Sequence, residues 1–276
     1  MHRLMAKILC AVLLAFFITT AAVFNCGGRV KASLPIGGSK LRVMTYNIHV
    51  GRGMDQRLDL RRIAGVINAE RPDLVGLQEV DRGVERTGRI DEIAELARLT
   101  RMEYAFAPNL RYQGGWYGVA VLSRLPIISV DHRRYANRSE AMRRGFLRVE
   151  VSVGGRVLNF VTTHLDYQSS EGRLFETEQL LRALKIIKGP LIVVGDFNDE
   201  PTGEAYKRML TRFTDAWAES GGDGSGFTYP ADQPRKRIDF IFWGVEAGSL
   251  WRVQHARVAD SLASDHRPVT AELWFE

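Results

Sequence analysis

The sequence predicts a layered α/β domain with mixed sheets. From Leu41 onward, short apolar runs alternate with amphipathic stretches, a pattern typical of strands that alternate with helices. The pair Gly154-Gly155 separates two apolar runs and indicates a two-residue hairpin between antiparallel strands. Residues 190–195 (PLIVVG) carry no polar side chain, as expected of a strand buried on both faces. Hairpins mixed with strand–helix alternation argue against a purely parallel sheet.

In the first half of this region the elements follow one another at short intervals. Residues 41–46 predict a strand, and Asp59 is a candidate N-cap for a helix that carries Ile63, Val66 and Ile67 at helical spacing. Pro72 ends that helix. The following patterns predict a strand at 74–77, a helix around 93–97, a strand at 119–122 and a new segment from 125.

The second half is richer in strands. The hairpin strands are predicted at 145–153 and 156–163, followed by a helix at 174–187, the buried strand at 190–195 and strands near 238–243, 253–258 and 269–274. No linker or shift in composition divides residues 41–276. We therefore expect one domain over 34–276, a monomer, preceded by a separate segment over 1–33.

The segment over residues 1–33 has the pattern of an export signal. Arg3 and Lys7 precede an apolar run at 8–18, and small residues follow it, which is typical of a secretory signal peptide. Extended to residue 24, the run has 17 residues, near the lower limit for crossing a membrane. An uncleaved anchor is therefore the alternative, and lipid attachment at Cys26 is a further one. Each predicts an exported protein that is periplasmic, secreted or membrane-anchored.

The same segment changes the meaning of the charge. The formal net charge is +6, but residues 1–33 hold four basic residues and no acidic one. The remaining 34 basic and 32 acidic residues give a net charge of only +2. Nucleic acid is therefore not favoured as a partner, because a large phosphate-tracking surface needs excess basic residues. Both cysteines lie in the segment, which excludes disulfides, a thiol nucleophile and a cysteine metal site from the domain.

Polar side chains follow strand after strand, and ligand sites of α/β folds gather at strand ends. These residues are Asn47 with His49, Gln78-Glu79, His164 with Asp166, Asp196 with Asn198, Asp239, and Asp265-His266. Each has a structural alternative when taken alone. Asp196 and Asn198 could form an Asx turn, His164 could be a hydrogen-bonded core histidine, and Asp265 could cap a turn. Their joint occurrence favours a site.

The residue types indicate phosphate ester chemistry. Oxygen ligands without sulfur favour a hard cation, Mg²⁺ or Mn²⁺, held by Asn47 and Glu79. Cleavage also needs an oriented water and charge neutralisation. We assign Asp196 to the water and Asn198 to a phosphoryl oxygen. Asp265 lies next to His266 in the sequence, and we expect its carboxylate to orient that imidazole.

Six ordered motifs, TYNIH, LQEV, THLD, GDFND, RIDFIF and SDHRP, resemble those of the endonuclease/exonuclease/phosphatase superfamily. The resemblance covers nearly all of residues 41–274. It implies a four-layer α/β sandwich, with two mixed sheets packed face to face and helices outside. It also implies Mg²⁺-dependent hydrolysis of phosphodiesters or phosphomonoesters by a free water, without a covalent intermediate.

The resemblance also implies a role for each matched residue. Asn47 and Glu79 correspond to the metal ligands, and Asp196 and Asn198 to the pair that activates water and steadies the transition state. Asp265 and His266 correspond to a terminal dyad whose aspartate also touches metal. The remaining matches are His164, which contacts the scissile phosphate or aids the leaving group, and Asp239, which lies close to the catalytic histidine.

Two residues outside the motifs are candidate phosphate contacts. Arg144 begins a predicted strand and would bind a phosphate bidentately, or else it is a solvated arginine; Tyr117 either reaches into the cleft or packs. The basic run 235–237 either attracts anionic substrate near the mouth of the cleft or is a solvated loop, and we favour the loop.

Three functions are compatible with this set. The first is an exported phosphodiesterase acting near membranes on a phospholipid-like or small substrate. The second is a secreted DNase I-like nuclease, and the third is a non-catalytic relative that binds a phosphorylated ligand. We favour the first, because every matched catalytic position holds the expected residue type and the corrected charge does not support DNA.

Overall fold

The computed structural model describes residues 39–136, 143–222, 224–244 and 251–275. The chain divides into two units, residues 1–33 and 34–276, and every described residue lies in the second. The predicted signal peptide or anchor therefore lies outside the described residues. Across the ranges that are described, no helix is long and apolar enough to cross a membrane.

The first sheet joins strands from both ends of the domain. Its spatial order is β11-β12-β1-β2-β4-β3, and β1 runs parallel to β2 while its other neighbour, β12, is antiparallel. The strands are β1 (Ser39–Asn47), β2 (Leu74–Arg82), β3 (Glu103–Tyr112), β4 (Gly115–Ser123), β11 (Trp251–Val258) and β12 (Val269–Phe275).

The second sheet is built from the middle of the chain, in the order β5-β6-β7-β8-β10-β9. Strands β7 and β8 are parallel, and the other pairs are antiparallel. Gly154 and Gly155 connect β6 to β7 with positive φ angles of 58° and 79°, as the predicted hairpin turn requires. The strands are β5 (Ile127–Arg134), β6 (Gly145–Val153), β7 (Arg156–His164), β8 (Leu191–Asp196), β9 (Thr214–Asp215) and β10 (Asp239–Gly244).

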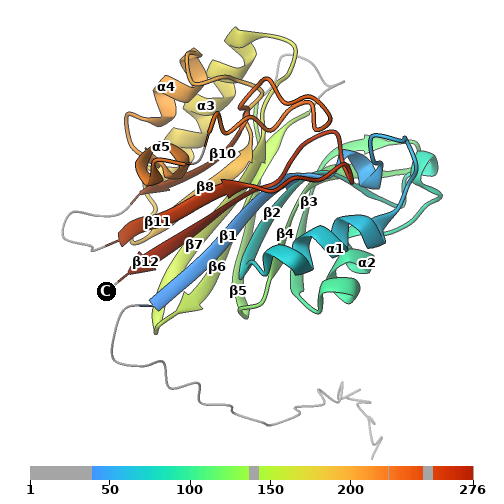
Figure 1. Ribbon diagram of the computed structural model, residues 1–276, viewed down its shortest axis with the longest axis horizontal. Helices are drawn as coiled ribbons and strands as arrows, with labels where there is room; N and C mark the ends of the chain where they lie inside the picture. Colours follow the sequence, from blue (N-terminus) through green and yellow to red (C-terminus); the bar gives the residue numbers. More distant parts are fainter. Residues whose placement is uncertain (1–38, 137–142, 223, 245–250, 276) are drawn as a thin grey trace, which may run out of the picture. The chain divides into compact units, whose positions relative to one another are not determined.

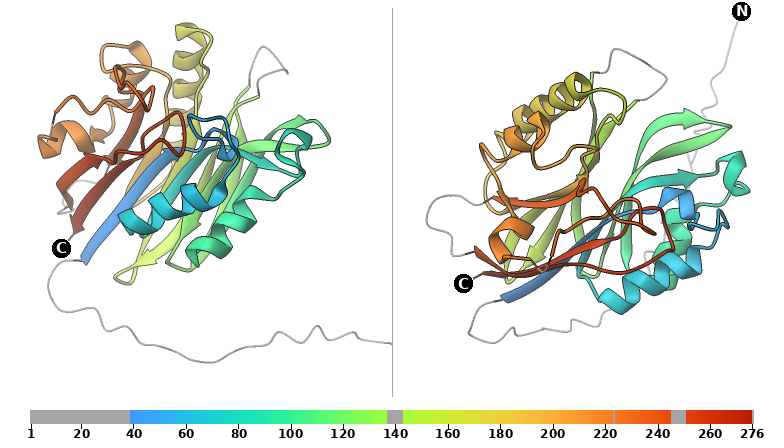
Figure 2. Two further views of the ribbon diagram at one scale, coloured as in Figure 1. Left: turned by 45° about the vertical axis from the view of Figure 1, so that its right-hand side comes forward. Right: turned by 45° about the horizontal axis from the view of Figure 1, so that its top comes forward.

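Helices cover the outer face of each sheet, as Figures 1 and 2 show. Helices α1 and α2 pack on the first sheet, and α3 and α4 on the second. The short helix α5 contacts the edge strand β11 and also β10. The helices are α1 (Leu60–Glu70), α2 (Glu92–Thr100), α3 (Ser170–Leu184), α4 (Glu204–Met209) and α5 (Ala216–Ser220), with 3₁₀ turns η1 (His49–Gly51) and η2 (Glu85–Thr87).

Three apolar cores separate the four layers. Alternation along β1 shows how one strand serves two of them: Val43 faces the core between the sheets, and Met44 faces the core beneath α1 and α2. The third core lies between the second sheet and α3 and α4. The predicted four-layer α/β sandwich is therefore confirmed. Asp59 caps α1 as expected, accepting from Arg61 N and Arg62 N.

The two sheets approach closely beside the strand ends that carry polar residues. A Cβ on Gly76 of β2 would lie 2.3 Å from Val194 Cγ2 of β8, so only glycine fits there. Two residues further along, Gln78 Nε2 donates to Thr162 Oγ1 of β7 over 2.9 Å. This buried bond ties the two sheets together directly behind Glu79.

Candidate active site

Strand register brings three of the predicted residues side by side in the second sheet. His164 ends β7, Asp196 ends β8 and Asp239 begins β10, and Asp196 lies opposite each of the other two. All three residues are at most 2% exposed. Because β7 and β8 are parallel while β10 is antiparallel, two strand ends and one strand start meet at the same edge.

The first sheet contributes Asn47 and Glu79 to the same place. Asn47 ends β1, opposite Gln78 of the parallel strand β2. Glu79 lies where the register of β2 shifts against β4, and its φ is +57°. Such bulges re-aim side chains, and here Glu79 Oε1 accepts a hydrogen bond from Asn47 Nδ2 over 3.1 Å.

Asp196 lies at the centre of this group. Its Oδ1 accepts from Asn198 N over 2.9 Å, so the Asx turn that was the structural alternative does form. Its Oδ2 is approached by three other side chains. Asn47 Nδ2 donates to it over 3.0 Å, and the Nε2 atoms of His164 and His266 lie 3.4 and 3.7 Å away. The turn and the site are therefore compatible, because each uses a different carboxylate oxygen.

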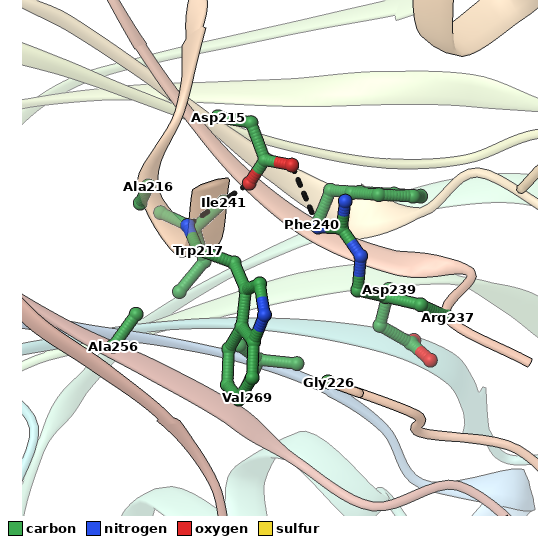
Figure 3. Close-up of a pocket in the computed structure, with 10 residues that line it drawn as sticks. All are labelled: Asp215, Ala216, Trp217, Gly226, Arg237, Asp239, Phe240, Ile241, Ala256 and Val269. Atoms are coloured by element: carbon green, nitrogen blue, oxygen red, sulfur yellow. Dashed lines mark hydrogen bonds and ion pairs between the residues drawn. The ribbon is translucent and has the colours of Figure 1, made fainter. Parts of the chain in front are cut away.

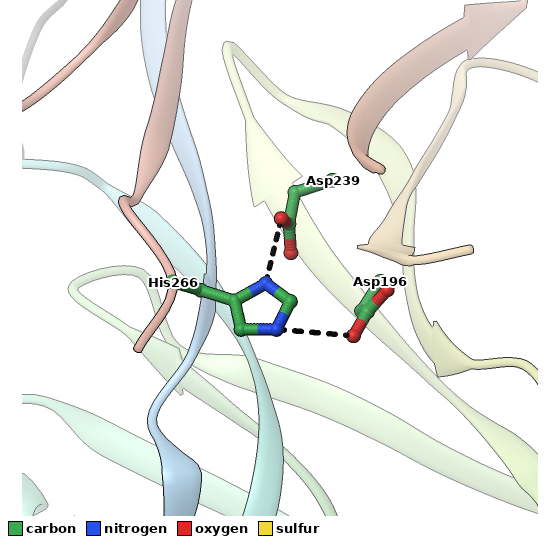
Figure 4. Close-up of side chains that lie close together, drawn as sticks. All are labelled: Asp196, Asp239 and His266. Carbon is green, nitrogen blue, oxygen red and sulfur yellow. Dashed lines mark hydrogen bonds and ion pairs between the residues drawn. The ribbon is translucent and has the colours of Figure 1, made fainter. Parts of the chain in front are cut away.

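His266 is oriented by Asp239, as Figure 4 shows. His266 Nδ1 lies 2.8 Å from Asp239 Oδ2. The expectation that the adjacent Asp265 orients this imidazole is wrong. Asp265 Oδ1 instead lies 3.3 Å from Ser264 Oγ and 3.7 Å from His49 Nδ1. Asp265 remains a candidate ligand, and His49 joins the site beside it.

For both His266 and Asp196, burial and the nearest opposite charge shift the pKa in opposite directions. Burial alone would lower the pKa of His266, but the carboxylates of Asp239 and Asp196 outweigh it and raise that pKa. Burial raises the pKa of Asp196, with Asp239 adding to the shift and His266 opposing it. It follows that the His266 imidazole is protonated and that the Asp196 carboxylate beside it is a stronger base than usual.

His164 is held in one tautomer by Arg144. Arg144 Nη1 lies 2.8 Å from His164 Nδ1, and because a guanidinium only donates, Nδ1 accepts and Nε2 carries the proton. Burial, followed by the charges of Arg144 and His266, places the pKa of His164 well below its usual value. His164 is therefore neutral and directs an N–H toward Asp196.

Arg144 itself is 4% exposed, which excludes the solvated alternative. Its Nη1 donates to Tyr117 Oη over 3.4 Å, and its guanidinium lies 5.9 Å from the Tyr117 ring. Its Nε is buried without a hydrogen-bond partner among the described residues. The two candidate phosphate contacts, Arg144 and Tyr117, thus lie together, with Arg144 beside His164.

Asn198 occupies its predicted position but directs its amide elsewhere. Its Nδ2 donates to Leu165 O over 3.1 Å, and its φ is +49°. The structure therefore shows Asn198 closing the turn after β8, while a contact to a phosphoryl oxygen stays a prediction.

One aromatic contact escaped the sequence reading. The Tyr229 ring lies 4.8 Å from the His266 ring, tilted by 44°. Tyr229 belongs to an irregular segment after α5, and no periodic pattern or motif distinguishes it from a packing residue.

The basic run 235–237 is not a solvated loop throughout. Arg237 is 8% exposed, and its Nη1 donates to Asp215 Oδ2 over 2.6 Å, as Figure 3 shows. Tyr206 Oη donates to the same oxygen, and the guanidinium lies 4.7 Å from the Phe240 ring. Arg237 is therefore a structural residue, buried next to the start of β10.

The donor set fits a divalent cation. Asp196, Asp239 and His266 each offer a ligand atom within 4.8 Å of the others. Asp239 Oδ1 is buried and, among the described residues, has no hydrogen-bond partner. Asn47 links this group to Glu79, because its Nδ2 donates both to Asp196 Oδ2 and to Glu79 Oε1. Several buried carboxylates so close together are stabilised by positive charge.

Comparison with protein families now gives the site a context. The family model described as "Endonuclease/Exonuclease/phosphatase family" matches residues 44–266. The chain belongs to this family. Endonuclease/exonuclease/phosphatase proteins hydrolyse phosphoester bonds and generally depend on a divalent metal, so the chain is a metal-dependent hydrolase of ester bonds.

Relatives in the endonuclease/exonuclease/phosphatase family match nearly the whole domain. The chain is 26% identical over 244 residues to the uncharacterized protein YbhP of Escherichia coli K12, a match that covers 84% of this chain and 95% of that protein. An endonuclease/exonuclease/phosphatase from Beutenbergia cavernae is 27% identical with a TM-score of 0.67, covering 86% and 72% of the two chains. The human Nocturnin catalytic domain with bound sulfate shares the fold, with a TM-score of 0.68, 21% identity and coverage of 86% and 94%.

Proposed function

We propose that this protein is an exported, Mg²⁺-dependent phosphodiesterase in which a water molecule attacks the substrate phosphorus. The position of Asp196 is the observation that supports this proposal most directly. One of its oxygens lies among Asn47, His164 and His266 in a buried group, and burial makes it a stronger base than an exposed aspartate.

Glu79, Asn47 and Asp265 are the residues that would hold the metal. Asp196, Asp239 and His266 are closer together, but His266 is hydrogen-bonded to Asp239 and its pKa is raised, so its imidazole is protonated. A protonated imidazole is not a ligand, so we assign this second group to proton transfer. When bound, Mg²⁺ or Mn²⁺ would neutralise charge on the phosphoryl oxygens.

The protein side chains then account for the protons. Asp196 accepts a proton from the attacking water as the new P–O bond forms. The His164 Nε2–H and the Arg144 guanidinium donate to phosphoryl oxygens, which stabilises the developing charge. The protonated His266, held by Asp239, gives its Nε2 proton to the leaving oxygen as the other P–O bond breaks.

A phospholipid-like or small phosphodiester is the first substrate candidate, because the N-terminal segment predicts export and proximity to a membrane. A secreted nuclease is the second. One structural observation favours it: arginine side chains lie against Tyr112, Trp116 and Tyr117 beside the site, and interleaved cations and aromatic rings suit nucleic-acid strands.

A substrate panel tests the proposal. The purified protein with Mg²⁺ is assayed on bis-p-nitrophenyl phosphate, plasmid DNA, sphingomyelin, phosphatidylinositol species and inositol phosphates. We expect hydrolysis of at least one diester, its loss in EDTA and its recovery with Mg²⁺ or Mn²⁺. Full activity after exhaustive chelation would remove the metal from the proposal, and inactivity on every ester would favour a binding protein. Cell fractionation tests export, with a variant that lacks residues 1–33 as the control.

A further inference from the structure

Arginines and aromatic rings alternate at the end of the β3–β4 hairpin. The Trp116 ring has Arg111 at 5.8 Å and Arg134 at 5.7 Å. Next to it, Arg86 lies 4.9 Å from the Tyr112 ring and 5.3 Å from the Tyr117 ring. These distances are within the range of cation–π contacts. Two strands of the first sheet and one of the second contribute to the contacts around Trp116.

Arg86 has a carboxylate partner, and the two guanidiniums at Trp116 have none among the described residues. Arg86 forms a two-pronged ion pair with Asp81, with N–O distances of 2.7 and 2.9 Å. Within the described ranges, neither Arg111 nor Arg134 lies within ion-pair distance of a carboxylate. Arg134 Nε and Nη2 instead donate to Pro108 O over 3.1 and 2.7 Å, which fixes this guanidinium beside the ring.

Arg134, at the end of β5, is paired with Gly145, which begins β6, so its backbone lies beside that of Arg144. Tyr117 contacts Arg144, and Trp116 contacts Arg134. The two strands are paired, with Tyr135 N donating to Arg144 O over 2.9 Å. Trp116 is half-buried while Arg111 and Arg134 are exposed. A substrate that extends from His164 along Arg144 would therefore approach Arg134, whose guanidinium, like that of Arg111, has no ion-pair partner among the described residues.

We propose that Arg111, Trp116 and Arg134 form a second anion subsite, which binds a phosphate group of the substrate other than the one that is hydrolysed. The guanidiniums bind phosphate oxygens through paired N–H groups, and the Trp116 ring limits their movement. The inference rests on the proposed phosphodiesterase function and narrows its substrates to diesters that carry an additional phosphate. A neutral or zwitterionic headgroup would leave the subsite unused.

Two matched substrate pairs test this subsite with the full chain and Mg²⁺. The dinucleotide TpT is compared with 5′-phosphorylated pTpT, and glycerophosphoinositol with glycerophosphoinositol 4-phosphate, by kcat/KM. We expect the extra phosphate to raise kcat/KM about tenfold in at least one pair, as a charged hydrogen bond would. A preference confined to the first pair identifies a nucleic-acid strand as the source of the phosphate, and one confined to the second pair identifies a lipid headgroup.

Variants connect the preference to these residues. Arg111→Gln, Arg134→Gln and Trp116→Ala should each bring the ratio of kcat/KM within a pair toward one. Arg61→Gln, which removes an exposed arginine from α1, should keep the wild-type ratio. A ratio of one in the wild-type protein for both pairs, or a preference that Arg111→Gln and Arg134→Gln leave unchanged, would overturn the inference.

A binding measurement separates this inference from the catalytic proposal. Calorimetric affinities for the same pairs are measured in Asp196→Ala, with and without Arg134→Gln. If no substrate is hydrolysed but the extra phosphate tightens binding and Arg134→Gln abolishes the gain, the subsite stands and the phosphodiesterase proposal fails. If hydrolysis occurs and the affinities within each pair are equal, the subsite fails and the phosphodiesterase proposal stands.

Discussion

Two buried arginines that precede strands of the second sheet have opposite surroundings. Arg237 is paired with Asp215, which also accepts from Tyr206. Among the described residues, the Arg144 guanidinium has only the neutral groups of His164 and Tyr117 at hydrogen-bond distance, while Glu79 and Asp196 act on it from further away. A buried cation is costly unless a negative charge accompanies it. Arg237 has its anion within the fold, and Arg144 is arranged to receive one from a ligand.

The largest expected effect lies in the candidate active site, the region around Arg144. Asp196→Ala should lower kcat by about 10²–10⁴-fold, the usual contribution of a general base. The thermal midpoint should stay at or above the wild-type value, because a carboxylate whose burial already raises its pKa is removed. Steady-state kinetics and calorimetry measure both. A near-wild-type kcat would remove Asp196 from the mechanism.

The region around Arg237, where the cation has its anion within the fold, should show the reverse: a loss of stability without a loss of activity. Asp215→Ala leaves Arg237 buried and unpaired, so the free energy of unfolding should fall by about 3–5 kcal/mol while the folded protein keeps its kcat. Denaturant titration provides the measurement. The double variant Asp215→Ala, Arg237→Met is the control and should recover much of the loss; no recovery would mean that the ion pair is not the cause.

Arg144→Met tests the comparison at the second arginine. The value of kcat/KM should fall about tenfold, as expected for the loss of a charged hydrogen bond to a phosphoryl oxygen. The free energy of unfolding should not decrease, because no carboxylate is left unpaired at hydrogen-bond distance. The matched variant Arg237→Met should lose stability. If both methionine variants lost stability equally, the difference between the two regions would disappear.

A third buried ionisable group, Glu92, should show its effect only as a dependence of stability on pH. Burial raises the pKa of Glu92 to about 8, although the N–H of Asp81 opposes the shift. Between the unfolded pKa of about 4.3 and this value, the folded state holds more protons, so stability decreases as pH rises. Glu92→Gln should flatten this slope between pH 5 and pH 8 in denaturant titrations. An identical slope in wild type and variant would contradict it.

The sequence predicted the central strands better than the edges. β8 is buried along its whole length and was recognised as an apolar run, and the Gly154-Gly155 hairpin is as expected. β3, β5 and the two-residue strand β9 were missed, and each lies at an edge of its sheet, whereas the edge strand β11 was predicted. β5 has no fully buried residue, so it carries no apolar run. Edge strands of this kind give little periodic signal.

The site shows the same limit in its pairings. Residue types and strand ends identified His164, Asp196 and Asp239, which the structure brings together. The partner of His266 was misassigned because Asp265 is its neighbour in the chain. Consecutive residues direct their side chains apart, and the register of β10 against β8 supplies Asp239 instead. Such pairings depend on folding between distant segments, which a single sequence does not display.

The pairing of β1 with β12 has a practical consequence for engineering. Ser39, at the start of β1, lies opposite Phe275, at the end of β12. Both positions are about 25–30 Å from Asn47, the length of a nine-residue strand. A short peptide could join residues 39 and 275 and the chain could be opened at the Gly154-Gly155 turn, giving a circular permutant. Attachment to a solid support through residue 275 would likewise leave the catalytic edge facing solution.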